Sequence, residues 1–135
     1  MLRNVLYLAV GVVILSGCVV NIQREDGLPK CTDSQVLRHV VLFKFKDTSS
    51  SQQIREVEDA FRALPDKVDE IYDFEWGTDV SVENLQQGFT HCFFVTFRSE
   101  ADRAAYLPHP AHKKFGKLLG PHLDKVLVID YWAAK

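Results

Sequence analysis

The chain has 135 residues, and its 16 Lys and Arg against 18 Asp and Glu leave a formal net charge of −2 at pH 7. With no basic stripe and no glycine-rich phosphate loop in the sequence, this balance argues against nucleic acid as a partner and against nucleotide chemistry. The length allows one small domain.

The N-terminal segment has the pattern of an export signal. Arg3 precedes an apolar run from Val5 to Leu15, and Leu15-Ser16-Gly17-Cys18 follows. The run is short for a membrane span and ends at small residues, which predicts a cleaved signal peptide over residues 1–17, with an uncleaved anchor as the alternative. The ending resembles the lipobox of bacterial lipoproteins. That resemblance implies lipidation of Cys18 and a lipid-anchored protein of the bacterial cell envelope, at the outer membrane or periplasmic face in a Gram-negative cell.

Residues 18–36 are polar and show no hydrophobic period, so we interpret them as a lipidated tether that holds a folded domain, residues 37–133, off the membrane surface. Cys31 lies in this tether and Cys92 in a later predicted strand. In an exported protein the two could form a disulfide, or Cys92 could be a buried packing thiol. The spacing lacks the C-x-x-C pairs of zinc sites built on sulfur.

The domain begins with an apolar strand and an amphipathic helix. His39 to Phe45 is apolar at nearly every position, which predicts a strand covered on both faces. Ser50 with Gln53 matches a capping box. Apolar residues at helical spacing then follow until Pro65 stops the pattern: Ile54, Val57, Phe61 and Leu64.

Two strands come next. Tyr72 to Trp76 alternates apolar and charged residues and ends at Gly77, which predicts a half-buried strand, and a polar turn runs to Gly88. Phe89 to Phe97 is apolar on both faces.

Two short helices and a last strand complete the domain. Ser99 is the predicted cap of a helix through Leu107, and Pro110 suits the first turn of a second helix that closes at Gly120-Pro121. Val126 to Trp132 is the last predicted strand. The order β-α-β-β-α-β predicts an α+β, ferredoxin-like fold.

The predicted sheet has too much apolar surface for one chain. Helices cover one face of such a sheet, yet its strands are apolar on both sides. Leaving that surface in water would favour aggregation, so we expect a homodimer in which two sheets pack face to face as an eight-stranded, barrel-like core.

The segment Tyr106-Leu107-Pro108-His109-Pro110-Ala111-His112 holds a phenol and two imidazoles. Groups of this kind share protons near neutral pH, which general acid–base chemistry requires. A purely architectural role is the alternative, and His109 beside Pro110 suits a helix cap.

Four motifs in order resemble the stress-responsive A/B barrel (Dabb) family: Arg38-His39-Val40-Val41-Leu42-Phe43-Lys44-Phe45-Lys46, Trp76-Gly77, Gly88-Phe89-Thr90-His91 and His109-Pro110-Ala111-His112. The resemblance covers residues 38 to 132 and implies a dimeric α/β barrel. The family includes plant stress proteins and one enzyme type, olivetolic acid cyclase, which closes a polyketide by an aldol condensation.

The resemblance to that cyclase implies catalytic roles for Tyr106 and His112. It also implies a ligand pocket that includes His39 and His91, with His109 beside it; for His39 and His91 a hydrogen-bonded core position is the alternative. The expected function is binding of a small, partly apolar molecule. Two alternatives stay open. The protein is either an enzyme, which would be a polyketide-cyclase-like lyase without organic cofactor, or a non-enzymatic stress-protection or scaffold protein. Several histidines could also converge with Asp79 or Asp130 around a metal ion, but no ligand spacing in the sequence supports a metal site.

Overall fold

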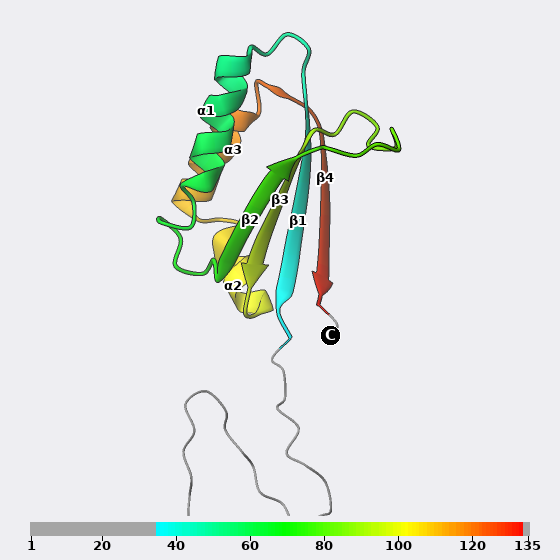
Figure 1. The fold of residues 1–135 in the computed structure, drawn as a ribbon. Coiled ribbons are helices and arrows are strands. Elements are labelled where there is room, and N and C mark those ends of the chain that lie inside the picture. The colour runs from blue at the N-terminus through cyan, green and yellow to red at the C-terminus, as the bar shows by residue number, and fades with distance from the viewer. Residues whose placement is uncertain (1–34, 134–135) are drawn as a thin grey trace, which may run out of the picture. The chain divides into compact units, whose positions relative to one another are not determined.

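Residues 35–133, which the computed structural model describes, form four strands and three helices. In chain order these are β1 (Leu37–Phe45), α1 (Ser51–Arg62), β2 (Asp73–Thr78), β3 (His91–Phe97), α2 (Glu100–Tyr106), α3 (Pro110–Leu119) and β4 (Leu123–Trp132). The strands lie in the order β2-β3-β1-β4, and each neighbouring pair is antiparallel (Figure 1). This arrangement confirms the predicted ferredoxin-like α+β fold.

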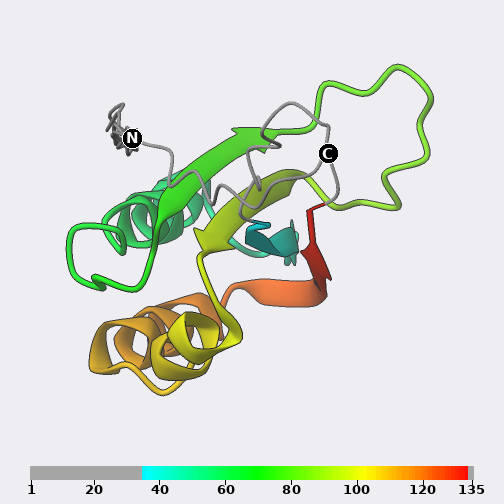
Figure 2. The ribbon, with the colours of Figure 1, turned by 90° about the horizontal axis from the view of Figure 1, so that it is seen from below.

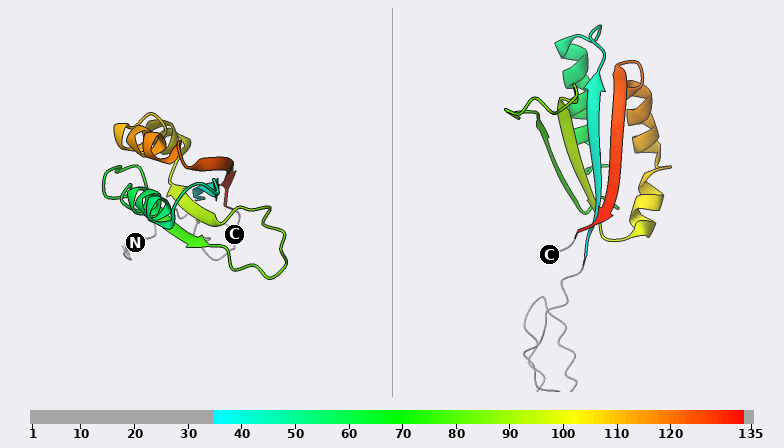
Figure 3. Two further views of the ribbon diagram at one scale, coloured as in Figure 1. Left: turned by 90° about the horizontal axis from the view of Figure 1, so that it is seen from above. Right: turned by 90° about the vertical axis from the view of Figure 1, so that its right-hand side faces the viewer.

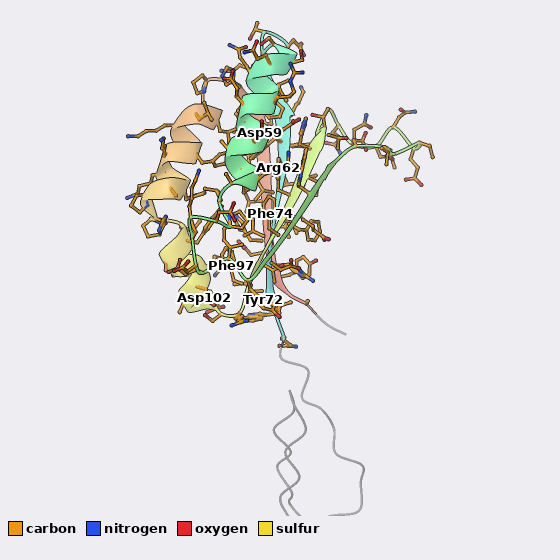
Figure 4. The ribbon with its side chains drawn as sticks, turned by 60° about the vertical axis from the view of Figure 1, so that its left-hand side comes forward. Asp59, Arg62, Tyr72, Phe74, Phe97 and Asp102 are labelled. Atoms are coloured by element: carbon orange, nitrogen blue, oxygen red, sulfur yellow. The ribbon has the colours of Figure 1, made fainter. Side chains whose placement is uncertain are left out.

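The helices cover one face of the sheet (Figures 1 and 3). Alternate residues of β1, from Leu37 through Phe45, point to this face and are buried. The centre of the core is aromatic: the Phe61 ring of α1 lies 4.3 Å from Phe93 and 4.5 Å from Phe115, centroid to centroid. Figure 4 shows Phe74 and Phe97 in the space between sheet and helices. These contacts fix α1 and α3 over the sheet.

The predicted capping box of α1 is present. The Ser50 hydroxyl accepts from the backbone N–H of Gln53 at 3.3 Å, and the Gln53 side chain accepts from the backbone N–H of Ser50 at 2.9 Å. The helix ends at Arg62, two residues before the predicted Leu64, which closes a tight turn to Phe61 through its backbone N–H.

Among the strand bounds that differ from the prediction, strand pairing decides two and a turn decides another. Strand β2 runs through Gly77 to Thr78, because Thr78 pairs with His91. Strand β3 begins at His91, two residues after the predicted Phe89, because Gly88 turns the chain at φ +83°. Strand β4 begins at Leu123 rather than at Val126, because it pairs along the full length of β1.

The second face of the sheet carries no helix in the described chain (Figure 3). We call this surface the open face; its residues include Val40, Leu42, Phe94, Leu127, Ile129 and Tyr131. Leu127, Ile129 and Tyr131 of β4 are 42%, 49% and 43% exposed. We predicted that both faces of the sheet are covered. Within the described chain, only the face toward the helices is covered.

The predicted signal peptide, the lipidation site Cys18 and Cys31 lie outside the described residues. Between Gln35 and Ala133, none of the helices combines the length and the apolar character that crossing a membrane requires.

Candidate functional site

The break between α2 and α3 positions Tyr106 and His112. Pro108 and Pro110 lack an N–H, so neither can continue the hydrogen-bond ladder of a helix. Tyr106 ends α2, and its carbonyl accepts from the backbone N–H of His109 at 3.0 Å. The Leu107 carbonyl instead accepts from Nδ1 of His112 at 2.9 Å. The Tyr106 and His112 rings consequently lie 4.3 Å apart, centroid to centroid.

A carbonyl oxygen only accepts, so His112 must carry its proton on Nδ1. In the neutral imidazole, Nε2 is then an acceptor and a candidate base.

His39 of β1 is held in the same way by a carboxylate. Its Nδ1 lies 2.8 Å from Oδ1 of Asp130, which β4 places directly opposite His39 in the sheet. The Arg103 guanidinium of α2 lies 3.4 Å from the same oxygen. The carboxylate accepts from His39 Nδ1–H, which again leaves Nε2 as the acceptor in the neutral ring. The His39 ring lies 5.9 Å from the Tyr106 ring.

These groups line one pocket of about 340 Å³ between the β1–β4 half of the sheet and helices α2 and α3. Its volume lies in the range of small-molecule sites. Polar groups from His39, Tyr106, His112 and Asp130 share it with an apolar wall. The wall consists of Val41, Phe43, Phe61, Leu107, Phe115, Leu119, Val126 and Val128, together with Gly116. The lining suits a small molecule that is largely apolar and carries one or two oxygen atoms.

Tyr106 is the most unusual group in the pocket. The residue is fully buried, and its hydroxyl has no hydrogen-bond partner among the described residues. Burial disfavours the phenolate and raises the pKa of Tyr106 far above its usual value of 10.0. The phenol therefore stays neutral at physiological pH and keeps a proton to donate. An unpaired buried hydroxyl costs free energy, which a ligand oxygen in the pocket would recover.

Two predicted pocket residues lie elsewhere. His91 does not line this pocket: its Nε2 lies 2.8 Å from Oε1 of Glu58 and its Nδ1 lies 2.8 Å from the Thr90 hydroxyl. Both ring nitrogens are occupied, so His91 ties β3 to α1. His109 accepts from the backbone N–H of Ala111 at 3.1 Å through Nδ1 and caps α3, as its architectural alternative predicts. The structure thus brings His39, Tyr106 and His112 together and separates His91 and His109 from them.

Sequence reasoning missed the roles of Asp130 and Arg103. Asp130 is the one charged residue between Val126 and Trp132. A lone carboxylate in an apolar strand is a signal for a buried partner, but His39 is 91 positions away, and only the pairing of β1 with β4 connects them. Arg103 gave no such signal, because helix surfaces commonly carry arginine.

Among residues 35–133, no group of three or more His, Cys, Asp and Glu side chains is arranged to hold a metal ion. Cys92 of β3 lies on the side of the sheet away from the helices, and burial, together with the charge of Glu75, raises the pKa of its thiol.

Comparison with known proteins identifies relatives of the whole domain. A stress-response A/B barrel domain-containing protein of Arabidopsis thaliana is 45% identical over 95 residues, which are 70% of this chain and 87% of the relative. Olivetolic acid cyclase of Cannabis sativa is 33% identical over 99 residues, which are 73% of this chain and 98% of the relative.

Comparison with solved structures also finds relatives that span the whole domain. The hydroxynitrile lyase of Passiflora edulis matches with a TM-score of 0.71 and 30% identity, over 76% of this chain and 96% of the lyase. A dimeric protein from Bacteroides fragilis with a ferredoxin-like fold matches with a TM-score of 0.60 and 25% identity, over 73% of this chain and 96% of that protein. The model of the stress responsive A/B barrel domain matches residues 37–133. This chain therefore belongs to the stress responsive A/B barrel domain (Dabb) family.

Proposed function

We propose that the pocket between the sheet and helices α2 and α3 binds a small, partly apolar molecule with a carbonyl or hydroxyl group and moves a proton on it. One observation carries the proposal: the buried Tyr106 hydroxyl has no partner and lies beside two imidazoles whose Nδ1–H groups are already used. Two relatives carry enzyme names, a cyclase and a lyase, which supports chemistry rather than binding alone.

The chemistry that fits is aldol-type and requires no organic cofactor. His112, as the base, takes a proton from the carbon next to a carbonyl, or from a hydroxyl in the cleavage direction. Tyr106 donates a hydrogen bond to the oxygen on which negative charge develops. In bond formation the enolate carbon attacks a second carbonyl, and the new alkoxide takes a proton back from the imidazolium of His112. In cleavage the alkoxide becomes a carbonyl as the C–C bond breaks, and the leaving enolate or cyanide takes that proton. His39, oriented by Asp130 and Arg103, contacts the edge of the Tyr106 ring and helps to hold it in place.

Two probe substrates test this proposal in both forms of the reaction. One is a cyanohydrin, which cleavage converts to an aldehyde and hydrogen cyanide; the other is a naphthyl β-hydroxyketone, which retro-aldol cleavage converts to a fluorescent aldehyde and a ketone. We expect turnover of at least one probe and a loss of about 100-fold or more in His112→Ala. His122→Ala is the matched control, because His122 bonds to Ser49 and lies outside the pocket. Equal activity of His112→Ala and wild type would refute the assigned base.

The names of the Arabidopsis relatives support one alternative, a non-enzymatic stress-protection protein or dimeric scaffold. This alternative predicts no turnover of either probe and unchanged protection of a heat-denatured client protein in Tyr106→Phe and His112→Ala. Loss of protection in either variant would contradict it.

The same proposal includes a homodimer in which two open faces pack together. Its support is the apolar surface of Leu127, Ile129 and Tyr131, the charged pairs at its border and the dimeric relative from Bacteroides fragilis. Arg38 bonds to Thr96 and lies 4.0 Å from Asp73 at one end of β1, and Lys44 lies 2.9 Å from Asp124 at the other. An apolar centre with a polar rim is typical of protein interfaces. Sedimentation of the full chain in mild detergent tests it, and a monomer at micromolar concentration would refute it.

We also propose that residues 1–17 are removed and that Cys18 is lipidated, which places the domain at the bacterial envelope on a tether. The support is the sequence of the first 18 residues. Cys18→Ser should leave an unprocessed precursor that incorporates no labelled fatty acid. Normal processing of Cys18→Ser would refute the proposal.

A further inference from the structure

The connection between β2 and β3 forms an apolar projection. We call residues 79–88 the arm. Val80, Val82 and Leu85 in the arm are 89%, 91% and 71% exposed, more than any other large apolar side chain among the described residues. Scattered exposed apolar residues are ordinary, but three on one short projection mark a contact surface.

The arm has a defined shape. Its backbone is held by its own polar side chains: the N–H of Ser81 donates to the Asp79 carboxylate at 3.0 Å, and the N–H of Glu83 donates to the Ser81 hydroxyl at 3.3 Å. At its far end the N–H of Phe89 donates to the Gln86 carbonyl at 2.9 Å. These hydrogen bonds restrict the backbone of the arm before any partner binds, which lowers the entropic cost of binding.

The arm extends on the side of the sheet opposite the helices (Figures 1 and 2). This is the side of the open face, where a second sheet would pack. The arm leaves the sheet at the β2–β3 edge, whereas β4 forms the other edge of the same sheet. If a two-fold axis parallel to the strands relates two copies, the β2 edge of one copy lies opposite the β4 edge of the other. The end of the sheet that carries the arm then lies beside the same end of the partner's sheet, where β4 begins.

Strand β4 has apolar surface that face-to-face packing leaves uncovered. Val126 and Val128 are 48% and 46% exposed, and they point to the helix side, where they line the pocket. A second sheet on the open face would cover Leu127 and Ile129 but cannot reach these two valines. Some other element must cover the outer side of the β4 edge if the dimer is to bury it.

We infer that the arm of one copy packs on the β4 edge of its partner, near Val126, and completes the wall of the partner's pocket. This inference rests on the proposed homodimer and adds that each pocket is built from two chains. Charge agrees with it: Asp79 and Glu83 are acidic, while Lys125 of β4 and Lys46, which follows β1 and bonds through its backbone to His122, have no ion-pair partner among the described residues. Val80 and Val82 supply the apolar contact.

Cross-linking between two distinguishable chains tests the contact. Full-length Val82→Cys in an isotopically heavy chain is mixed with light Val126→Cys, the subunits are exchanged under reducing conditions in mild detergent, and the thiols are then oxidised. Peptide mapping identifies which cysteines are joined. We expect a disulfide between the two introduced thiols, linking a heavy chain to a light one. Lys67→Cys, exposed in the connection between α1 and β2, replaces Val82→Cys in the control and should give no such link.

A second variant keeps the result interpretable if cysteines disturb the arm. In Val80→Ser with Val82→Ser and Leu85→Ser, the dissociation constant of the dimer should rise about tenfold or more, because every 1.4 kcal/mol of lost contact is tenfold. A dimer with unchanged affinity and no heavy-to-light link would overturn the arm contact and leave the homodimer standing. A wild-type monomer would overturn both, whereas loss of probe turnover in His112→Ala is independent of either outcome.

Discussion

Replacing Tyr106 by Phe should make the protein more stable and remove its function. The hydroxyl is fully buried without a hydrogen-bond partner, and burying such a group costs about 1–3 kcal/mol in proteins. Phe keeps the ring, and with it the contacts to His39, Phe97 and His112. We therefore expect Tyr106→Phe to raise the free energy of unfolding by about 1–2 kcal/mol, which corresponds to a rise in Tm of about 4–8 °C per kcal/mol for a domain of this size.

Thermal unfolding followed by circular dichroism, at one fixed protomer concentration, measures the effect. Tyr72→Phe is the matched control: Tyr72 is 52% exposed and lies outside both the pocket and the open face, so removing its hydroxyl should change stability by less than about 0.5 kcal/mol. In the activity assays we expect turnover to be lost in Tyr106→Phe and kept in Tyr72→Phe. A Tyr106→Phe protein destabilised by about 1 kcal/mol or more would show that the hydroxyl has a partner, and the argument that it awaits a ligand would fail.

Asp130→Asn should reduce turnover by about tenfold or more, because the amide can present either an acceptor or a donor to His39; a changed tautomer of His39 in nitrogen NMR is the readout that a merely structural effect would not produce. Spectrophotometric titration should show Tyr106 as the last tyrosine to ionise, because burial raises its pKa above the ordinary 10.0. As pH rises, Tyr106 therefore loses its proton in the unfolded chain before it does so in the folded protein. The contribution of Tyr106 to the free energy of unfolding should be constant below pH 10.0 and fall above it, and Tyr106→Phe should lack this fall. His91→Ala should lower stability by about 1–3 kcal/mol in urea unfolding, because Glu58 loses its partner at 18% side-chain exposure, yet leave turnover within about twofold; a large loss of turnover would return His91 to the site.

Local sequence patterns correctly predicted those helix ends that depend on neighbouring residues. The capping box at Ser50, the stop before Pro65 and the break at Pro108 and Pro110 each act within one turn of chain, so they were readable from the sequence. The ends of β2 and β4 were less accurate, because hydrogen bonding to another strand decides them.

The site divides in the same way. Tyr106 and His112 are six positions apart, and two prolines between them bring their rings together, so their pairing followed from a short segment. His39 and His91 looked equivalent, since both are histidines in apolar strands. The partners separate them: Asp130 from β4 orients His39 toward the pocket, and Glu58 from α1 occupies His91.

By itself, the sequence determined the class of fold, the family and the two pocket residues carried by one local segment, because hydrophobic period, caps and prolines act over a few residues. Only the tertiary structure decided which histidine has a free nitrogen, that the Tyr106 hydroxyl is buried without a partner, and that the arm projects on the side of the open face. Each of these depends on residues brought together from far apart in the chain, and burial and hydrogen-bond partners are properties of that assembled neighbourhood.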